Sequence, residues 1–129
     1  MNMSMIVLVL QIGVAVVFFY FGMLKIILPL EKIEKKVSWA NDYPISRLRL
    51  FGLCEVLGAL GLVLPYQLDI FPILTPVAAT ALAMVMSGAA MVHLKRDEIG
   101  MIFVNIFIVF LLAGIGYNSL IDILNVDVV

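Results

Sequence analysis

Four apolar stretches dominate this chain and constrain its fold more than any other feature. They cover residues 5–27, 46–64, 76–93 and 97–120. A helix needs about 20 mostly apolar residues to cross the roughly 30 Å hydrocarbon core of a bilayer. Apolar residues make up 64% of the chain and its mean hydropathy is +1.19, which is far from the composition of soluble domains. The sequence therefore predicts an all-α membrane protein: one domain over residues 1–129, built as an antiparallel bundle of four transmembrane helices.

Several residues predict where these helices begin and end. Pro65 lacks a backbone donor, so we expect the second helix to stop before it. Thr75 and Pro76 have the order of an N-cap followed by a first helical residue, which predicts the start of the third helix. Asp97 and Glu98 suit the positive N-terminal end of the fourth helix.

The connection between the first and second spans is the one sizeable polar segment. One face of a helix there would carry its apolar residues, Leu30, Ile33, Val37 and Ala40. Such an amphipathic segment predicts a short helix lying in the membrane interface, with Trp39 and Tyr43 at the level of the lipid headgroups.

The basic residues predict the orientation of the bundle. All eight lie at or beside the first and third connections: Lys25, Lys32, Lys35, Lys36, Arg47, Arg49, Lys95 and Arg96. Because cytoplasmic loops carry the excess of lysine and arginine, both connections are expected in the cytoplasm and both termini outside. The net charge of −1 gives no reason to expect a nucleic-acid partner.

The strongly polar residues inside the spans fall at similar membrane depths, one per span. They are Lys25, Glu55, His93 and Asn105. With a rise of about 1.5 Å per residue, three of them lie roughly 6 to 10 Å inside their helix ends, and His93 lies about 3 Å inside. Side chains lean toward the N-terminus of their helix, so the two descending and two ascending helices direct these groups toward one level. Such groups cost several kcal/mol in lipid unless they find partners or water, which predicts a shared polar site.

Each of the four residues also has a purely structural interpretation. Lys25 has a stem long enough to carry its charge to the headgroups. Glu55 and Lys25 can form a buried ion pair that only fixes packing. His93 can lie in the interface beside the basic turn, and Asn105 can hold two helices together by a hydrogen bond.

Small residues accompany two of these positions. They are Gly52, Gly58, Ala59 and Gly61 around Glu55, and Ala83, Ser87, Ala89 and Ala90 before His93. Small side chains let helices approach closely in lipid, or leave room for a ligand. Four larger residues nearby either pack a core or line an adaptable pocket: Phe21, Met84, Met86 and Met91.

Several kinds of site are excluded. The single Cys54 cannot form a disulfide or a Cys-x-x-Cys motif within one subunit, and we expect it to be buried as a small apolar side chain. One histidine with one membrane carboxylate is too few ligands for a closed metal site, and two haem ligands are also lacking. The sequence contains no nucleotide-binding loop and no nucleophile elbow.

The chain resembles the DoxX-like family of small bacterial four-helix membrane proteins over nearly its whole length. The resemblance rests on Phe21–Lys25, Arg49–Pro65, Met91–His93, Lys95–Arg96 and Asn105. It implies a four-helix bundle in the bacterial plasma membrane. Members of the family are associated with thiosulfate–quinone oxidoreductase subunits and oxidative-stress complexes, and distant eukaryotic relatives with receptor assembly. Because Cys54 stands alone, the chain departs from a cysteine-based redox mechanism.

We therefore expect a ligand-binding site formed by Lys25, Glu55, His93 and Asn105, with no catalytic or metal-ligating residues. The expected ligand is a small lipophilic molecule such as a quinone or a lipid. The protein would act as an accessory to a membrane redox or stress system, either as a homodimer or within a larger membrane complex. Three other functions stay open: a membrane enzyme with Glu55 and His93 as acid and base, a proton-coupled transporter, and a membrane chaperone or assembly factor.

Overall fold

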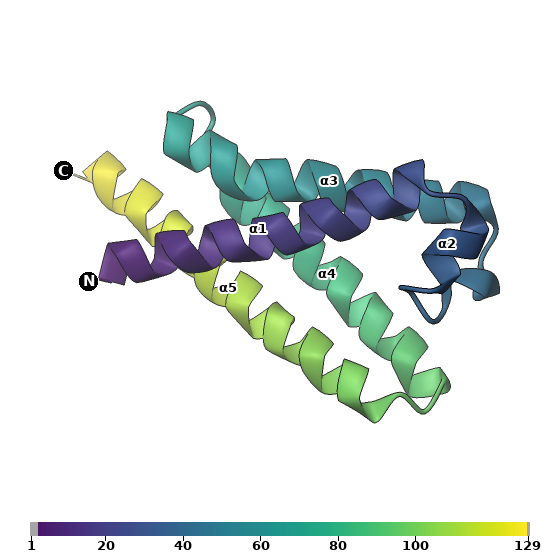
Figure 1. Ribbon diagram of the computed structural model, residues 1–129. Helices are drawn as coiled ribbons and strands as arrows, with labels where there is room; N and C mark the ends of the chain where they lie inside the picture. Colours follow the sequence, from purple (N-terminus) through teal and green to yellow (C-terminus); the bar gives the residue numbers. More distant parts are fainter. Residues whose placement is uncertain (1–2, 129) are drawn as a thin grey trace.

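The structure, a computed structural model that describes residues 3–128, is entirely helical (Figure 1). Its helices are α1 (Met3–Ile27), α2 (Leu30–Glu34), the 3-10 helix η1 (Ala40–Asp42), α3 (Ile45–Leu68), α4 (Leu74–Lys95) and α5 (Ile99–Val128). The four long helices α1, α3, α4 and α5 are each long and apolar enough to cross a membrane. The predicted all-α architecture with four spans is therefore confirmed.

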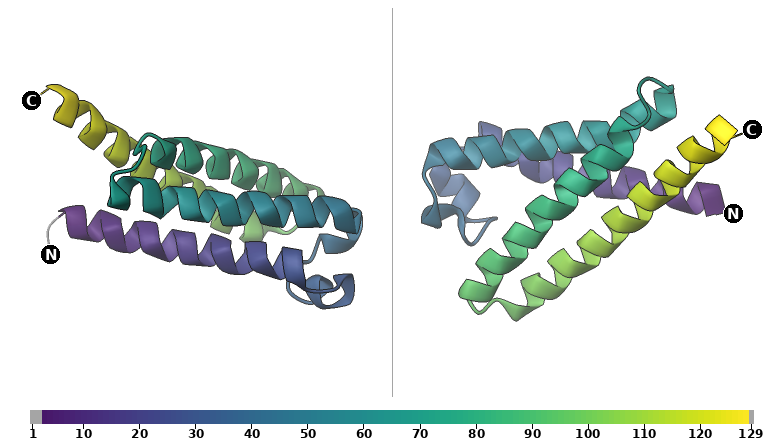
Figure 2. Two further views of the ribbon diagram at one scale, coloured as in Figure 1. Left: turned by 90° about the horizontal axis from the view of Figure 1, so that it is seen from above. Right: turned by 180° about the vertical axis from the view of Figure 1, so that it is seen from behind.

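The long helices are arranged as two antiparallel pairs. Helix α1 lies along α3, and α4 lies along α5 (Figures 1 and 2). The two pairs come together at the end that holds both termini, and they diverge toward the end that holds α2 and the α4–α5 turn. All the basic residues lie toward this second end, on or beside the two connections.

The apolar core lies where the two pairs meet, and every long helix contributes to it. Its buried members are Val14, Ala15, Phe18, Ala59, Leu62, Ala79, Leu82, Leu112 and Ile115. Since lipid is as apolar as these side chains, close packing rather than escape from water is what holds helices together in a membrane. This core therefore fixes how the two pairs cross.

Two glycines bring α1 and α3 into backbone contact. A Cβ atom on Gly22 would lie 2.7 Å from the carbonyl oxygen of Gly52, and one on Gly52 would lie 2.6 Å from that of Gly22. Neither position has room for a side chain unless the helices move apart. The close approach holds the two antiparallel helices so that the long side chain of Lys25 on α1 reaches Glu55 on α3.

The predicted end of the second span at Pro65 is wrong, because α3 continues through this proline to Leu68. A proline at position 65 leaves the carbonyl of Gly61 without its helical donor. The hydroxyl of Thr75 donates to that carbonyl at 3.0 Å, and the neighbouring Leu62 carbonyl accepts a hydrogen bond from Gln11 Nε2 at 2.5 Å. Side chains of α4 and α1 thus support the backbone around the proline.

The third and fourth helices also begin differently from the prediction. Helix α4 begins at Leu74 with Ile73 as its N-cap, so Thr75 is not the cap. Its hydroxyl is used instead to bridge to α3. Helix α5 begins at Ile99 and not at 97, because Asp97 has a left-handed backbone with φ of 58°. It also continues beyond the expected residue 120, to Val128.

The polar connection is partly as predicted. Ile33, Val37 and Ala40 are all buried, as the helical-face pattern indicates. The helix itself stops at Glu34, however, and a turn separates it from η1. Trp39 and Tyr43 pack against an apolar cluster that this connection forms with Leu24 of α1 and Leu48 of α3. The connection is therefore a folded cap on the bundle.

The prediction that Cys54 is buried is wrong. Its side chain is exposed on the surface of α3, as are those of its neighbours Leu53 and Leu57. The helix is apolar all round, so hydropathy could not distinguish its inner face from its outer one.

Candidate functional site

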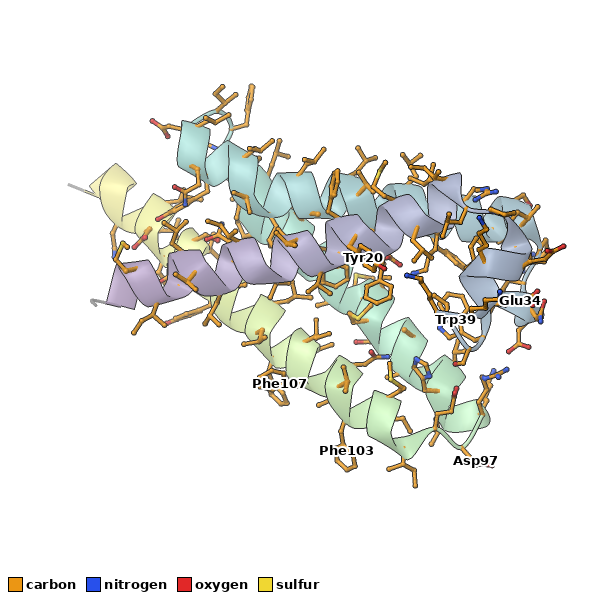
Figure 3. All side chains as sticks on the ribbon, viewed as in Figure 1. Tyr20, Glu34, Trp39, Asp97, Phe103 and Phe107 are labelled. Carbon is orange, nitrogen blue, oxygen red and sulfur yellow. The ribbon has the colours of Figure 1, made fainter. Side chains whose placement is uncertain are left out.

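A cavity of about 740 Å³ lies between the two helix pairs at the end where they diverge. Its walls come from α1, α3, α4, α5 and the connection that follows α2. Figure 3 shows Trp39 of this connection pointing into the space between the pairs, whereas Phe103 and Phe107 point outward from α5. All four polar residues singled out in the sequence line this cavity: Lys25, Glu55, His93 and Asn105.

Lys25 and Glu55 form an ion pair at one side of the cavity. The Nζ atom lies 2.5 Å from Glu55 Oε1, and both side chains are buried. The ammonium group also lies 5.4 Å from the centre of the Trp39 ring, a favourable cation–π distance. Lys25 therefore does not extend to the headgroups. Its charge is held at the cavity wall by a carboxylate and an aromatic ring.

Arg49 supports this arrangement from outside the cavity. Its guanidinium donates to the carbonyl oxygens of Lys25 and Leu28, both at 2.6 Å. Carbonyls in the last turn of a helix lack intrahelical donors, and an arginine there also suits the negative end of the helix dipole. The arginine thus anchors the end of α1 on which Lys25 stands.

His93 is hydrogen-bonded to Glu98 across the α4–α5 turn. The Nδ1 atom lies 3.1 Å from Glu98 Oε1, and the ring is buried. Hydrogen bonds from the Ser38 hydroxyl, from His93 and from Arg96 lower the pKa of Glu98, against an opposing effect of desolvation. An ionised carboxylate only accepts hydrogen bonds, so Nδ1 carries the hydrogen and Nε2 of a neutral ring is left as an acceptor.

A group of exposed and partly buried polar residues joins the two helix pairs at the mouth of the cavity. We call Ser38, Asp42, Arg96 and Glu98 the clasp. Arg96 pairs with Asp42 of the connection at 2.8 Å and with Glu98 at 3.0 Å. The hydrogen bond from Arg96 to Asp42 is the main cause of a raised pKa for Arg96, so the guanidinium stays charged. The clasp therefore links the capping connection to the α4–α5 turn.

Asn105 is the one of the four polar residues whose burial no hydrogen bond of its amide nitrogen explains. Its side chain is 4% exposed, and its Nδ2 atom is buried with no hydrogen-bond partner among the described residues. Buried amide donors are almost always hydrogen-bonded, because an unmet donor costs free energy. The interhelical hydrogen bond considered for Asn105 is thus not made through this atom.

The remaining walls of the cavity are mostly apolar and aromatic. Trp39, Tyr43 and Phe51 pack edge to face, with ring centres 5.6 to 6.1 Å apart. Met84 and Met101 lie on the opposite helices and are exposed on the membrane-spanning segments. The cavity is therefore bounded on one side by the surface that lipid would cover.

Comparison with known proteins identifies the family. The sequence model of the DoxX-like family matches residues 9–115, a segment that contains every span-embedded residue of the cavity. The chain belongs to the DoxX-like family. No curated protein and no solved structure is significantly similar to this DoxX-like protein. The resemblance seen in the sequence is thus confirmed.

Two cavity residues of this DoxX-like protein that contact the predicted polar groups, Glu98 and Trp39, were not predicted as members of the site. Glu98 was interpreted only as a favourable charge at a helix end, yet it is the partner of His93. The signal for this pairing was the position of Glu98, five residues after the histidine and across a turn. Trp39 was expected at the level of the lipid headgroups but was not predicted to face Lys25, whose Nζ lies 5.4 Å from the centre of its ring. As the only tryptophan in the chain, it offers a spectroscopic probe of the cavity.

The small and flexible residues divide between two uses. Gly52 serves the close contact of α1 with α3. Gly88 and Ala89 line the cavity, and a Cβ atom on Gly88 would meet nothing within 4 Å. Phe21, Met84 and Met86 also line it, whereas Met91 is exposed elsewhere. Among the described residues, no group of three or more potential ligands is placed to hold a metal ion.

Proposed function

We propose that this DoxX-like protein binds a small lipophilic molecule, a quinone or a lipid, in the cavity between its helix pairs. The head of the ligand lies among Lys25, Glu55, His93 and Asn105, and its apolar body lies against the aromatic and methionine side chains. In this proposal the protein is an accessory to a membrane redox or stress system, and its ligand is held rather than converted.

The observation that carries this proposal is an unpaired buried amide in a mostly apolar cavity. Ligand sites typically have volumes of about 300 to 1,000 Å³, apolar walls and a few polar groups that orient the ligand. The cavity has a volume of about 740 Å³ and includes Asn105, whose Nδ2 has no partner. A core that only held helices together would satisfy its polar groups internally and leave no such space.

The orientation of the protein is part of the proposal. The basic residues lie at the end that contains the cavity mouth, so the positive-inside rule places the site in the cytoplasmic half of the plasma membrane and both termini outside. Cysteine labelling tests this in a Cys54→Ala background. A cysteine at position 34 should resist a membrane-impermeant reagent in intact cells and react after lysis. Labelling in intact cells would reverse the orientation.

A matched pair of glycine variants tests ligand binding. Gly88 lines the cavity and Gly114 does not, yet a Cβ atom at either position would have open space within 4 Å. Gly88→Leu should place a side chain in the cavity, whereas Gly114→Leu adds the same side chain elsewhere. Lipophilic molecules retained through purification in a bilayer nanodisc are then extracted and identified by mass spectrometry.

The expected result is one molecule that is enriched over bulk lipid with the wild type and Gly114→Leu, and lost with Gly88→Leu. Equal recovery from all three proteins, or no enriched molecule with the wild type, would contradict the proposal.

A further inference from the structure

We infer that the ligand's head is an uncharged hydrogen-bond acceptor, a carbonyl group, and that Asn105 is the residue that selects it. This inference rests on the proposed function, because it concerns the chemistry of the same cavity. It is carried by the balance of charge in the cavity wall and by the unpaired donor of Asn105.

The buried charges of the cavity wall cancel one another. Two lysines and two glutamates line it: Lys25, Lys36, Glu55 and Glu98. Lys25 is neutralised by Glu55 at 2.5 Å, and Glu98 accepts from Arg96 at 3.0 Å. Lys36 has no carboxylate partner among the described residues, but it is exposed and donates to the Tyr20 hydroxyl at 2.8 Å, so its charge lies at the surface. The His93 ring adds a charge only when it is protonated. A charged head inside the cavity would therefore give up its hydration and find no unpaired buried charge of opposite sign, which disfavours carboxylates and amines.

The hydrogen-bonding groups favour an acceptor over a donor. The Nδ2 of Asn105 is a buried donor with no partner among the described residues. Lys25 has three N–H groups, one of which donates to Glu55 Oε1. The Nδ1 of His93 is already hydrogen-bonded to Glu98, which leaves Nε2 of the neutral ring as an acceptor. Among the described residues, however, the buried side-chain N or O atom without a hydrogen-bond partner is a donor, Nδ2 of Asn105. A carbonyl oxygen of the ligand would satisfy it.

The position of Asn105 makes it a selecting residue rather than a structural one. An apolar ligand would fill the cavity and leave the amide unpaired, whereas a carbonyl would satisfy it. Sites built to hydrogen-bond a ligand discriminate strongly against analogues that lack the group, because the protein's own polar atom then stays unpaired. Asn105 therefore selects against alkanes, and the balanced charges select against ions.

A series of probes with one chain length separates these contributions. The probes are a medium-chain methyl ketone, the corresponding methyl ester, the alkane and the carboxylate. Each is titrated into the protein in nanodiscs, and its binding is followed by the emission of Trp39, which lies at the cavity wall and is the only tryptophan. The ketone and ester arms distinguish a ketone-bearing ligand from an ester lipid.

We expect the wild type to bind the ketone or the ester more tightly than the alkane and the carboxylate. Asn105→Leu should weaken binding of the carbonyl probe about tenfold, the typical value of one hydrogen bond, and leave alkane binding unchanged. Asn118→Leu is the matched control, since Asn118 lies on the same helix and outside the cavity. The thermal stability of ligand-free Asn105→Leu should equal or exceed that of the wild type, because the unpaired amide is gone.

Three results would overturn the inference. Preferential binding of the carboxylate would show that the head is charged. Equal carbonyl affinity in the wild type and Asn105→Leu, or a large loss of stability in that variant, would show that Asn105 does not select the head. If none of the four probes alters Trp39 emission and none is retained on the protein, the proposed function fails together with the inference. The wild-type series needs no variant to fold.

Discussion

The two ends of this bundle differ in how the same four helices pack. At the end that holds the termini, all four helices contribute to one buried apolar core. At the other end, the pairs separate around a cavity of about 740 Å³, and the clasp and the capping connection join them. Since helices in lipid are held by close packing, the tight end can supply stability while the open end keeps space. Stability and space are thus separated along the length of the molecule.

The largest expected effect lies at the Lys25–Glu55 pair, in the cavity wall at the open end. Glu55→Ala leaves a buried cation without its partner and should destabilise the protein by roughly 3 to 5 kcal/mol. The double variant with Lys25→Ala should lose less, because no charge is stranded. A double-mutant cycle measured by denaturant unfolding checks this. Additive effects would show that the two side chains do not stabilise each other.

The next effect compares two positions on α4, one in the apolar core and one in the cavity wall. Leu82 is 1% exposed in the core, so Leu82→Ala should cost at least about 2 kcal/mol through the cavity that it leaves. Met84, two residues further along, is exposed and lines the cavity, so Met84→Ala should cost less than about 0.5 kcal/mol. Unfolding free energies measure both. Similar losses at the two positions would mean that the open end is packed as firmly as the core.

Only some of the features behind these expectations could be predicted from the sequence. The four spans followed from hydropathy, and the gathering of Lys25 with Glu55 followed from helix rise and side-chain lean. The passage of α3 through Pro65 did not, because the Thr75 hydroxyl that supports it comes from another helix. Local rules for a proline cannot include a donor that only the tertiary fold supplies.

The divergence of the helix pairs was also beyond the sequence. It depends on which faces of four almost uniformly apolar helices touch, and hydropathy does not distinguish those faces. The exposed Cys54 shows the same limit. His93 was placed correctly among the polar groups, but its partner Glu98 was not, since the turn that brings them together has a left-handed residue at Asp97. Such a conformation is uncommon outside glycine, although aspartate adopts it more often than most residues do, so it is hard to foresee at a given position.

A smaller effect is expected from the clasp. Its charged groups are exposed, so Arg96→Gln should change the unfolding free energy by less than about 1 kcal/mol. It should nevertheless release the capping connection, and amide hydrogen exchange in residues 36–43 should become faster. Lys95→Gln removes the neighbouring positive charge and serves as the control. Unchanged exchange in Arg96→Gln would show that apolar packing alone closes the open end.

The smallest effect is a dependence of the clasp on pH. The pKa of Glu98 is lowered from its usual value of 4.5 in the folded protein, by Ser38 first and then by His93 and Arg96. A lowered pKa stabilises the clasp above the usual value, and this contribution is lost as the pH falls through the lowered one. Hydrogen exchange in residues 36–43 should therefore become faster on acidification.

Two variants identify the carboxylate whose protonation makes the exchange faster, a change that we call the acid step. Glu98→Gln should remove the step, because glutamine does not titrate. Asp42→Asn removes the other carboxylate of the clasp and should leave the step in place. An acid step that disappears with Asp42→Asn and persists in Glu98→Gln would assign the release to Asp42 and leave no role for Glu98.

The exposure of Met84 and Met101 on the spanning segments has a consequence for how binding is measured. A molecule that reaches the cavity through that side comes from the surrounding leaflet and never from water. The relevant concentration is then its mole fraction among the lipids, which greatly exceeds its aqueous concentration for any lipophilic compound. A modest intrinsic affinity is enough to fill the cavity under those conditions. Occupancy should follow the composition of the membrane, so titrations at different lipid-to-protein ratios should coincide only when plotted against mole fraction.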